Sequence, residues 1–358
     1  MLDIDFIRKN PDKVERGAKL KGFDVDVFEL LKTDEKRRKI LKLVEKIRFQ
    51  KNIASKEISK IKDKKEKERI ISQMQILDKE SDRLEKNLEI VRKKLKQLME
   101  KIPNLPLENV PVGKDEKDNV VLREVGEKRK FDFPPKSYLE IAEKLDLIDM
   151  KRAAKISGSR FGILKREAVL VQFAILNFTF EKLLKEGFTL ILPPVMIKEE
   201  MAKGTGYFEA TDLEEAYYLP KDNLFLIGTS EQSLISMHAN EVFEEEELPK
   251  RYLGFSTCFR REAGSYGKDT KGIFRVHQFD KIEMVSFCKP EDSIKEHQFF
   301  LSLEENLMKE LNLPFRVVQI CTGDLGRPAA AKFDIETWFP SENRYRETHS
   351  TSNCTDFQ

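Results

Sequence analysis

The sequence has no long hydrophobic run, and this absence argues against a membrane-spanning protein. The longest apolar stretch, residues 168–180, is interrupted by Gln172, Asn177 and Thr179. A bilayer-spanning helix needs about 20 mostly apolar residues. The N-terminal residues are acidic and contain no apolar segment of the signal-peptide type. We therefore predict a cytoplasmic protein, in keeping with a charged fraction of 36%.

Cysteines are few and widely separated. None of the four belongs to a Cys-x-x-Cys pair or has a histidine at metal-ligand spacing: Cys258, Cys288, Cys321 and Cys354. This pattern favours reduced thiols over disulfides, and no zinc site is expected. The four histidines also have no serine, cysteine or aspartate partner at a recognisable triad spacing. Any chemistry must therefore come from positioning and charge stabilisation.

The chain also has no glycine-rich phosphate loop. Neither a Walker-type loop nor a Gly-x-Gly-x-x-Gly after a predicted strand is present. If the protein binds ATP, arginines have to hold the phosphates, because a planar guanidinium can contact two phosphate oxygens at once. The search for a nucleotide site therefore turns to arginines on strands.

Residues 34–101 contain no glycine and no proline. In their second half, seam residues follow alternating steps of four and three: Ile70, Met74, Leu77, Ser81, Leu84, Leu88, Val91, Leu95 and Leu98. The first half has a looser seam: Ile40, Leu43, Ile47, Gln50, Ala54, Ile58 and Ile61. Residues 62–68, between the two seams, are all charged. This pattern predicts an antiparallel coiled-coil hairpin, an arm roughly 45 Å long.

The net charge of +2 conceals a strong asymmetry. Residues 34–101 carry 23 Lys/Arg and 13 Asp/Glu, so the remainder of the chain is net negative. A basic segment joined to an acidic body favours contact between that segment and a polyanion. The plainer alternative is a lysine-rich coiled coil that its charges merely keep soluble. Such an arm could also dimerise or brace the fold.

The length predicts two domains, or one large domain with an appendage. Residues 1–33 are expected to form short helices, one of them opened by Asn10-Pro11. Prolines between residues 102 and 111 end the arm and mark a linker. Beyond it we predict strands at residues 189–196, 224–228, 252–261, 272–288 and 315–321, and helices at 166–186 and 291–312. The expected fold is α+β, with domains at residues 1–102 and 120–358 and a linker at 103–119.

Two of the predicted strands carry a distinctive set of side chains. Phe259-Arg260-Arg261-Glu262 is followed, after a loop with three glycines, by Arg275-Val276-His277-Gln278-Phe279 and then Glu283. On a strand, alternate residues share a face, so Arg260 should point with Glu262, and Arg275 with Phe279 and Glu283. Such a surface can clamp a triphosphate and stack a base. The alternative is an edge hairpin with ordinary solvated charges, which contribute little to stability.

Two further segments place acids beside hydroxyls. Thr229 and Glu231 would share a face under strand spacing and offer a hydroxyl and a carboxylate to a small amine, although Thr-Ser-Glu also commonly starts a helix. Glu347 and Ser350 supply the hard oxygen donors that Mg²⁺ prefers, and could bridge it to phosphates. The alternative for residues 345–358 is a polar loop rich in serine and threonine.

The hairpin resembles motif 2 of the class II aminoacyl-tRNA synthetases, and residues 187–196, with Pro194, resemble motif 1. Over essentially the whole chain the sequence is similar to the bacterial-type seryl-tRNA synthetases. The quoted stretches include Ile102-Pro-Asn-Leu-Pro106, Gly204-Thr-Gly206, residues 259–270, His277-Gln-Phe-Asp-Lys281, residues 321–326 and residues 352–358. The resemblance implies a class II antiparallel-sheet catalytic domain flanked by helices, following the helical arm.

The resemblance also implies functions for individual residues. The activity would be ATP-dependent activation of L-serine, with transfer to tRNA(Ser), or also to tRNA(Sec), in a homodimer with Pro194 at its interface. The arm would grip the long variable arm of the tRNA. Serine would contact Thr229, Glu231 and Glu283. ATP would contact Arg260, Glu262, Arg275, Val276, Phe279, Glu347 and Ser350, the last two with Mg²⁺.

The sequence departs from the family pattern at two places. Relatives continue to a further segment, motif 3, so the sequence is expected to be C-terminally incomplete, which leaves the activity of the 358-residue chain open. His349 stands where many relatives have serine. A non-catalytic tRNA-binding protein derived from a synthetase is the alternative, although the intact motif 2 favours the enzyme. A ligase that charges a carrier protein would be expected to lack the basic arm.

Overall fold

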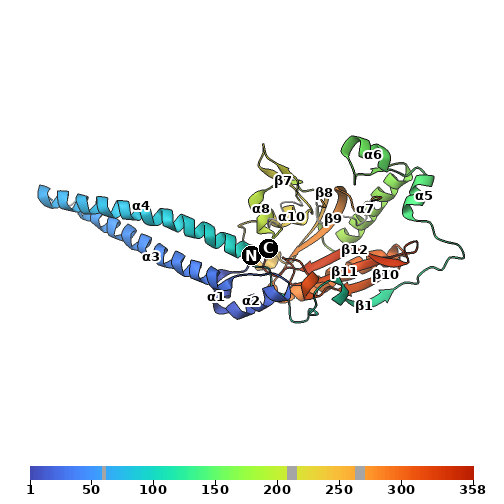
Figure 1. Ribbon diagram of the computed structural model, residues 1–358, viewed down its shortest axis with the longest axis horizontal. Helices are drawn as coiled ribbons and strands as arrows, with labels where there is room; N and C mark the ends of the chain where they lie inside the picture. Colours follow the sequence, from blue (N-terminus) through green and yellow to red (C-terminus); the bar gives the residue numbers. More distant parts are fainter. Residues whose placement is uncertain (59–61, 208–215, 263–270) are drawn as a thin grey trace. The chain divides into compact units, whose positions relative to one another are not determined.

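The computed structural model describes residues 1–58, 62–207, 216–262 and 271–358, and the chain divides into two compact units (Figure 1). The arm unit comprises Leu2–Lys19 and Phe23–Ile102. The body comprises Met1, Leu20–Gly22 and Pro103–Gln358. A search of the described residues found no helix with the length and apolarity needed to cross a bilayer.

The arm unit consists of helices. Two short helices, α1 (Ile4–Lys9) and α2 (Pro11–Leu20), precede the long helices α3 (Val27–Ile58) and α4 (Lys64–Glu100). The last two lie side by side along their length, which confirms the predicted helical hairpin (Figure 1). Helix α3 begins before residue 34, so the arm is longer at this end than predicted. Asp63 caps α4, because its carboxylate accepts a hydrogen bond from the Lys65 backbone at 3.1 Å.

The seam of the arm is confirmed in α4 and differs by two residues in α3. Its buried residues are Ile40, Val44, Ile47, Leu84, Leu88 and Val91. Val44 is 1% exposed whereas the predicted Leu43 is 49% exposed. The predicted Gln50 is exposed as well, and its neighbour Lys51 is half-buried. The steps of four and three that hold in α4 also hold in α3 once Val44 replaces Leu43 and Lys51 replaces Gln50. The predicted seam residue Ile61 lies outside the described residues.

One buried carboxylate lies at the start of the arm. Asp34 is fully buried and pairs with Arg8 at 2.7 Å, Arg37 at 2.9 Å and Arg38 at 3.2 Å. Burial alone would raise the pKa of Asp34, but hydrogen bonds from Arg8 and Arg37 outweigh it and lower the pKa. Asp34 therefore joins α1 to α3 through charge.

The body contains a four-stranded antiparallel sheet in the order β1-β10-β11-β12. Its strands are β1 (Val120–Val125), β10 (Phe315–Gln319), β11 (Ala331–Phe339) and β12 (Arg344–Asn353). One face packs against helix α11 (Ser293–Glu310) through Leu301, Met308, Phe315, Val317, Phe333 and Ile335. Only β10 was predicted. The polar-loop alternative for residues 345–358 is wrong for most of the segment, because residues 344–353 pair with β11.

A second sheet has the order β4-β8-β9, with β4 (Thr189–Ile191) parallel to β8 (Lys250–Phe259) and β8 antiparallel to β9 (Gln278–Phe287). Strand β8 begins and ends two residues earlier than predicted, so it ends before Arg260. Strand β9 is shorter than predicted and begins after Arg275. The predicted strand at 189–196 is divided, because Pro193 and Pro194 cannot donate backbone hydrogen bonds. Its second part is β5 (Met196–Lys198).

The remaining elements surround these sheets. Strand β5 forms a small sheet with β7 (Leu224–Leu226) and β6 (Tyr218–Leu219), and β2 (Ile148–Asp149) pairs with β3 (Ile163–Leu164). The helices are α5 (Tyr138–Lys144), α6 (Met150–Ser157), α7 (Glu167–Lys185), α8 (Glu199–Gly204) and α10 (Glu231–Ser236). Phe188, Leu253 and Phe300 share a core cluster with Leu183 of α7, so the packing on this side of β8 is apolar.

Candidate functional site

The predicted arginines lie at the open end of the β8–β9 hairpin rather than on its strands. The Arg260 backbone N–H donates to the His277 carbonyl at 3.0 Å, which continues the pairing by one residue. Glu262 then has a φ of +54°, so the backbone turns and the predicted shared strand face with Arg260 is wrong. Arg275 still meets Glu262 in an ion pair of 2.8 Å. The loop residues 263–270 lie outside the described part of the chain.

Arg260 and Phe279 form one surface. The Arg260 guanidinium carbon lies 5.2 Å from the centroid of the Phe279 ring, and Arg260 Nε donates to the Gly228 carbonyl at 3.2 Å. Phe279 projects from β9, as predicted, whereas Val276 is buried just before the strand begins. A guanidinium over a half-buried aromatic ring offers charge and a stacking surface at the same place.

Two other predicted residues meet directly. The Thr229 hydroxyl donates to Glu283 Oε2 at 2.5 Å, and the Lys281 ammonium donates to the Thr229 oxygen at 3.1 Å. Lys281 also pairs with Glu283. Lys281 and Glu283 are two residues apart on β9 and share a face with Phe279. The arginine–aromatic surface and the hydroxyl–carboxylate pair therefore lie along one face of one strand.

Glu231 comes to this place from a helix. It is the first residue of α10 and its backbone N–H donates to Thr229 Oγ1 at 3.3 Å, so the strand spacing predicted for this pair is wrong and the helix-start alternative is right. The Glu231 carboxylate accepts hydrogen bonds of 2.7 Å from the Tyr207 hydroxyl and from Gln358 Nε2. The predicted set thus includes two neighbouring carboxylates held by different elements.

A glycine allows this close approach. Gly254 of β8 pairs with Glu283 of β9. A Cβ added to Gly254 would lie 2.7 Å from Leu234 Cδ1 and 3.0 Å from Ser230 Oγ, closer than such contacts normally occur. Any side chain here would push α10 away from the sheet. Gly254 therefore lets the start of α10 bring Thr229 within reach of Glu283.

The charges of this pocket influence one another. Burial raises the pKa of Glu231 and nearby Glu283 raises it further, whereas Lys281, Gln358 and Tyr207 lower it. Burial would lower the pKa of Lys281, but the two carboxylates outweigh that cost and raise it. Burial and Glu231 raise the pKa of Tyr207 well above its usual value, so the phenol stays a hydrogen-bond donor.

Sequence reasoning missed Tyr207, Lys281 and Gln358 as members of the pocket. Lys281 carried a usable signal, because it lies two residues from both Phe279 and Glu283 on a predicted strand. Tyr207 and Gln358 gave no such signal, since they approach Glu231 from segments far apart in the chain. Only the tertiary fold brings them together.

Glu347 and Ser350 share one face of β12 because of a bulge. Glu347 pairs with Glu336 and His349 with Ile335, so Thr348 is an extra residue in the ladder. In a regular strand without a bulge, residues three apart face opposite sides of the sheet. Ser350 pairs with Asp334, and Lys332 lies 3.2 Å from Asp334 Oδ1. Burial raises the pKa of Asp334 to about 7, and Glu347 adds to the rise, whereas Lys332 and Ser350 oppose it.

Pro194 is exposed in the connection between β4 and β5, and its carbonyl accepts a hydrogen bond of 2.8 Å from Ser233. Large apolar side chains are also exposed on α7 and around the end of β4: Leu170, Val171, Phe173, Ile175, Leu184, Leu190, Leu192 and Met196. Such a concentration of exposed apolar residues is typical of a surface that meets another protein.

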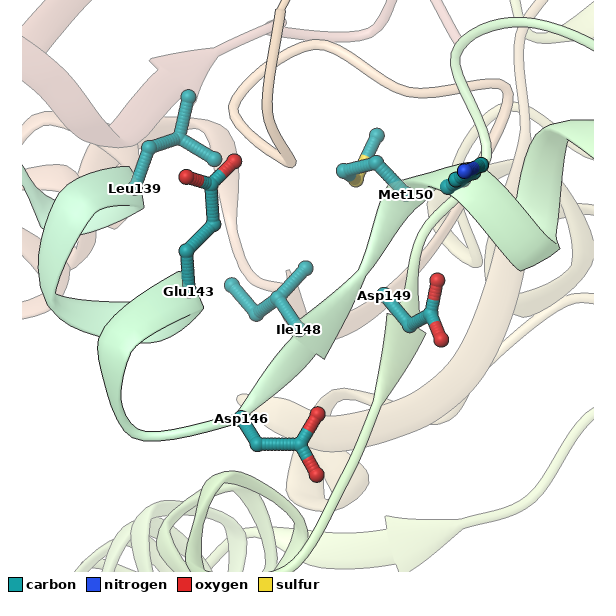
Figure 2. Close-up of a pocket in the computed structure, with 7 residues that line it drawn as sticks. Leu139, Glu143, Asp146, Ile148, Asp149 and Met150 are labelled. Atoms are coloured by element: carbon teal, nitrogen blue, oxygen red, sulfur yellow. The ribbon is translucent and has the colours of Figure 1, made fainter.

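A pocket of about 520 Å³ lies elsewhere in the body (Figure 2). It is lined by Leu139, Glu143, Asp146, Ile148, Asp149, Met150 and Lys151. Asp146 pairs with Lys165 and Arg166, and Asp149 pairs with Arg152, so these two acids are already neutralised. The pocket shares no lining residue with the surface of β9 described above, and we do not assign the chemistry to it.

Comparison with known proteins found relatives that match the whole chain. Residues 1–106 match the family model of the seryl-tRNA synthetase N-terminal domain, and residues 217–358 match the class II tRNA synthetase core domain (G, H, P, S and T). The serine–tRNA ligases of Dictyoglomus turgidum and Thermobifida fusca are each 41% identical over all of this chain and 85% and 84% of their own lengths. A crystal structure of seryl-tRNA synthetase from Pyrococcus horikoshii, complexed with ATP, matches with a TM-score of 0.89 and 38% identity, over all of this chain and 85% of that one. The chain therefore belongs to the seryl-tRNA synthetase family.

Proposed function

We propose that this protein attaches L-serine to tRNA(Ser) in two steps, through a seryl-adenylate. One observation carries the proposal: the Thr229–Glu283 pair and the Arg260–Phe279 surface lie on the same face of β9. An amino acid held at the first would present its carboxylate to a nucleotide held at the second. Its relatives named serine–tRNA ligase, with the ATP complex of one of them, support the same assignment.

The residues of this face would divide the work of activation. Glu231 and Glu283 would hold the ammonium and hydroxyl groups of serine, with Thr229 between them. Phe279 would stack on adenine, next to the buried Val276 backbone, and Arg260 and Arg275 would contact the phosphates, with Glu262 orienting Arg275. A serine carboxylate oxygen would then bond to the α-phosphorus as pyrophosphate leaves. Arginines favour this step because they stabilise charge that develops on phosphate oxygens.

Transfer needs no protein nucleophile. A terminal hydroxyl of the tRNA would attack the activated carbonyl carbon, its proton would leave, and AMP would depart with the bonding electrons of the mixed anhydride. Positioning by the pocket accounts for the rate of such a step. This agrees with the absence of a catalytic triad in the sequence.

We further propose that Glu347 and Ser350 hold Mg²⁺ on the triphosphate. The bulge at Thr348 directs both toward the face that carries Asp334, and all three supply hard oxygen donors. No cluster of three or more His, Cys, Asp and Glu suited to a metal occurs among the described residues, so phosphate oxygens would have to complete the coordination. Mg²⁺ would neutralise phosphate charge there. Glu347→Gln should raise the Mg²⁺ concentration needed for half-maximal activation, and an unchanged Mg²⁺ requirement would contradict this assignment.

We propose a homodimer that uses the exposed apolar face of α7 and the Pro194 segment. Isolated exposed leucines need no explanation, but this group is concentrated on one helix and the adjoining strand end. Sedimentation equilibrium should give twice the chain mass. Leu170→Asp with Phe173→Asp should give the monomer, and a monomeric parent protein would contradict the proposal.

For the arm we propose contact with the tRNA backbone, because its exposed lysines and arginines can displace counterions from phosphates. tRNA(Sec) is proposed as a second substrate, since backbone contacts carry no base sequence information by themselves. Charging assays with both transcripts would test this. We also propose a cytoplasmic location, where these substrates occur, and fractionation of cells would test it.

The experiment that tests the main proposal is ATP–pyrophosphate exchange, followed by aminoacylation. Exchange should depend on serine and not on alanine or threonine, and charging should require tRNA(Ser). Binding of tRNA(Ser) without serine-dependent exchange would favour the alternative, a non-catalytic tRNA-binding protein derived from a synthetase.

A further inference from the structure

Three charged side chains of the serine pocket lie within reach of one another. Glu231 and Glu283 are both half-buried acids, and Lys281 is the cation between them in the described structure. Lys281 pairs with Glu283 and donates to Thr229 at 3.1 Å. One third of its side chain is exposed, so the stem of Lys281 reaches the surface while its ammonium contacts Glu283 and Thr229.

The sequence fixes this arrangement through strand spacing. Lys281 and Glu283 are two residues apart on β9, pairing with Ser256 and Gly254 of β8. Glu283 contacts Thr229 because Gly254 leaves room for the start of α10. Glu231 follows Thr229 by two residues and therefore lies nearby. The β8–β9 register therefore keeps the backbone of Lys281 two residues from Glu283 on the same face of β9.

Burial and the neighbouring Glu283 raise the pKa of Glu231, so ionisation of Glu231 in this pocket needs a nearby positive charge. With Lys281 charged and both acids ionised, the three groups carry one net negative charge. The ammonium group of an amino acid would neutralise that charge. Without Lys281 the pocket would carry two negative charges, and one acid would tend to take up a proton.

We propose that Lys281 is a positioning and specificity residue: it offsets the negative charge of the two carboxylates and holds Glu283 where a substrate hydroxyl must bind. This inference rests on the proposed function, because it assumes that the ligand is serine. A protonated Glu231 would bind the ammonium group poorly, and a displaced Glu283 would lose the hydroxyl. Lys281 acts through these acids rather than on the reacting atoms.

Among the described residues, the charged and titratable groups around the acids come from several elements. Lys281 and Glu283 lie on β9, Glu231 on α10, Cys258 on β8 and Glu304 on α11. Tyr207 comes from the segment after α8 and Cys354 from the segment after β12, and Arg260 lies further along the face of β9. Burial raises the pKa of Tyr207 and of Cys354, so both stay neutral near pH 7. Burial also raises the pKa of Cys258 and of Glu304. Loss of Lys281 would therefore remove positive charge that none of them can replace, and the pKa of Glu231 would rise further.

The test compares Lys281→Met with Lys281→Arg by serine-dependent pyrophosphate exchange from pH 6 to pH 9. Lys281→Met should lower kcat/KM for serine roughly 10- to 100-fold near pH 7, as for the loss of a hydrogen bond to a charged group. The deficit should shrink as the pH rises, because Glu231 then ionises without help. Lys281→Arg should restore most of the activity and the original pH profile, and KM for ATP should change little in both.

Lys289→Met is the matched control, because Lys289 also pairs with a glutamate, Glu245, but on the surface. It should leave the serine profile unchanged. A pH-independent loss in Lys281→Met, with KM for ATP raised equally and no rescue by arginine, would overturn the proposal and indicate a structural role.

A second measurement does not depend on activity. Carboxyl-labelled glutamate NMR should report a higher pKa for Glu231 in Lys281→Met than in the parent protein and in Lys281→Arg. An equal pKa in all three proteins would overturn the inference. If the parent protein shows no serine-dependent exchange, the proposed function fails, and the NMR titration still decides the charge argument separately.

Discussion

The arm and the body contain the same types of charged residue in different surroundings. In the arm, Arg48 pairs with Glu85 while 62% and 44% of their side chains are exposed. In the body, Lys281 lies near Glu231 and Glu283 in a pocket where burial and neighbouring charges shift the pKa of both Lys281 and Glu231. Water screens the first kind of charge and much less the second. The proposed function of the arm therefore depends on the number of its charges. The proposed function of the pocket depends on the position of each charge.

The largest effect should follow from shortening the arm. Replacing residues 52–77 with a short glycine–serine turn removes seven Lys/Arg and four Asp/Glu but keeps the buried seam from Ile40 to Val91. We expect kcat/KM for tRNA(Ser) to fall by roughly 1,000-fold, as when several phosphate contacts are lost. Serine-dependent pyrophosphate exchange should stay within about twofold, since no residue of the pocket changes. An equal fall in exchange would show that the two regions do not divide the work.

The next largest effect should come from a single residue of the body. Glu283→Ala removes a carboxylate that holds Thr229 and Lys281. Serine kcat/KM in exchange should fall by about 2–3 kcal/mol in transition-state stabilisation, the value of a hydrogen bond to a charged group. KM for ATP should change much less, because Phe279 and the arginines are untouched. If weaker ATP dependence accompanied an unchanged serine dependence, Glu283 would belong to the nucleotide site instead.

Mutation of a buried ion pair in the arm should have a large effect, as for the buried charges of the body and unlike the exposed ion pairs of the arm. Asp34→Asn leaves three arginines without their shared carboxylate and should destabilise the arm unit by about 3 kcal/mol, as for a broken buried ion pair. Because the folded pKa of Asp34 is lowered, its contribution is complete above its unfolded pKa and is lost as the pH falls through the folded value. Urea unfolding below about pH 4 should therefore show a smaller difference between the two proteins. A constant difference would rule out the charge explanation.

The smallest effect should come from an exposed pair. Arg48→Ala breaks the contact with Glu85 and should change unfolding free energy by less than about 1 kcal/mol. Thermal unfolding with and without 1 M salt would measure it, and salt should make the difference smaller still. A loss comparable to that of Asp34→Asn would mean that exposure does not separate the two classes of ion pair.

The sequence predicted the arm more completely than the body, for a physical reason. A coiled coil depends on neighbours three and four residues away, so its seam is visible in the chain itself. Its two errors, Leu43 for Val44 and Gln50 for Lys51, are each a shift of one residue within the same rule. In the body, β12 was missed because its buried residues are Thr351 and Asn353 rather than apolar side chains, and because Thr348 interrupts its alternation. Strand β11 was missed although Phe333 and Ile335 alternate with Asp334 and Glu336.

The candidate site could be predicted as a set of residues but not as a geometry. Thr229, Glu231 and Glu283 do meet, although the strand spacing used to group Thr229 with Glu231 is wrong. Strand β8 ends before Arg260 and Glu262, and β9 begins after Arg275, although all three residues were predicted to lie on these strands. Tyr207 and Gln358 could not be found, because contacts between distant segments leave no periodic signal. The binding roles given above to Thr229, Glu231 and Glu283 are proposals.

The extra residue at Thr348 separates the direction of Glu347 from its distance along the chain. Glu347 stays opposite Glu336 and Ser350 opposite Asp334, although three positions separate the two residues in the sequence. Deleting Thr348 would place them two positions apart in a regular strand, which again puts both on one face. Straightening the bulge while keeping Thr348 would instead turn Glu347 to the opposite face, with no named side chain changed. For this strand, loss of the bulged residue is therefore the milder change, and loss of the bulge itself is the one that separates the acid from the hydroxyl.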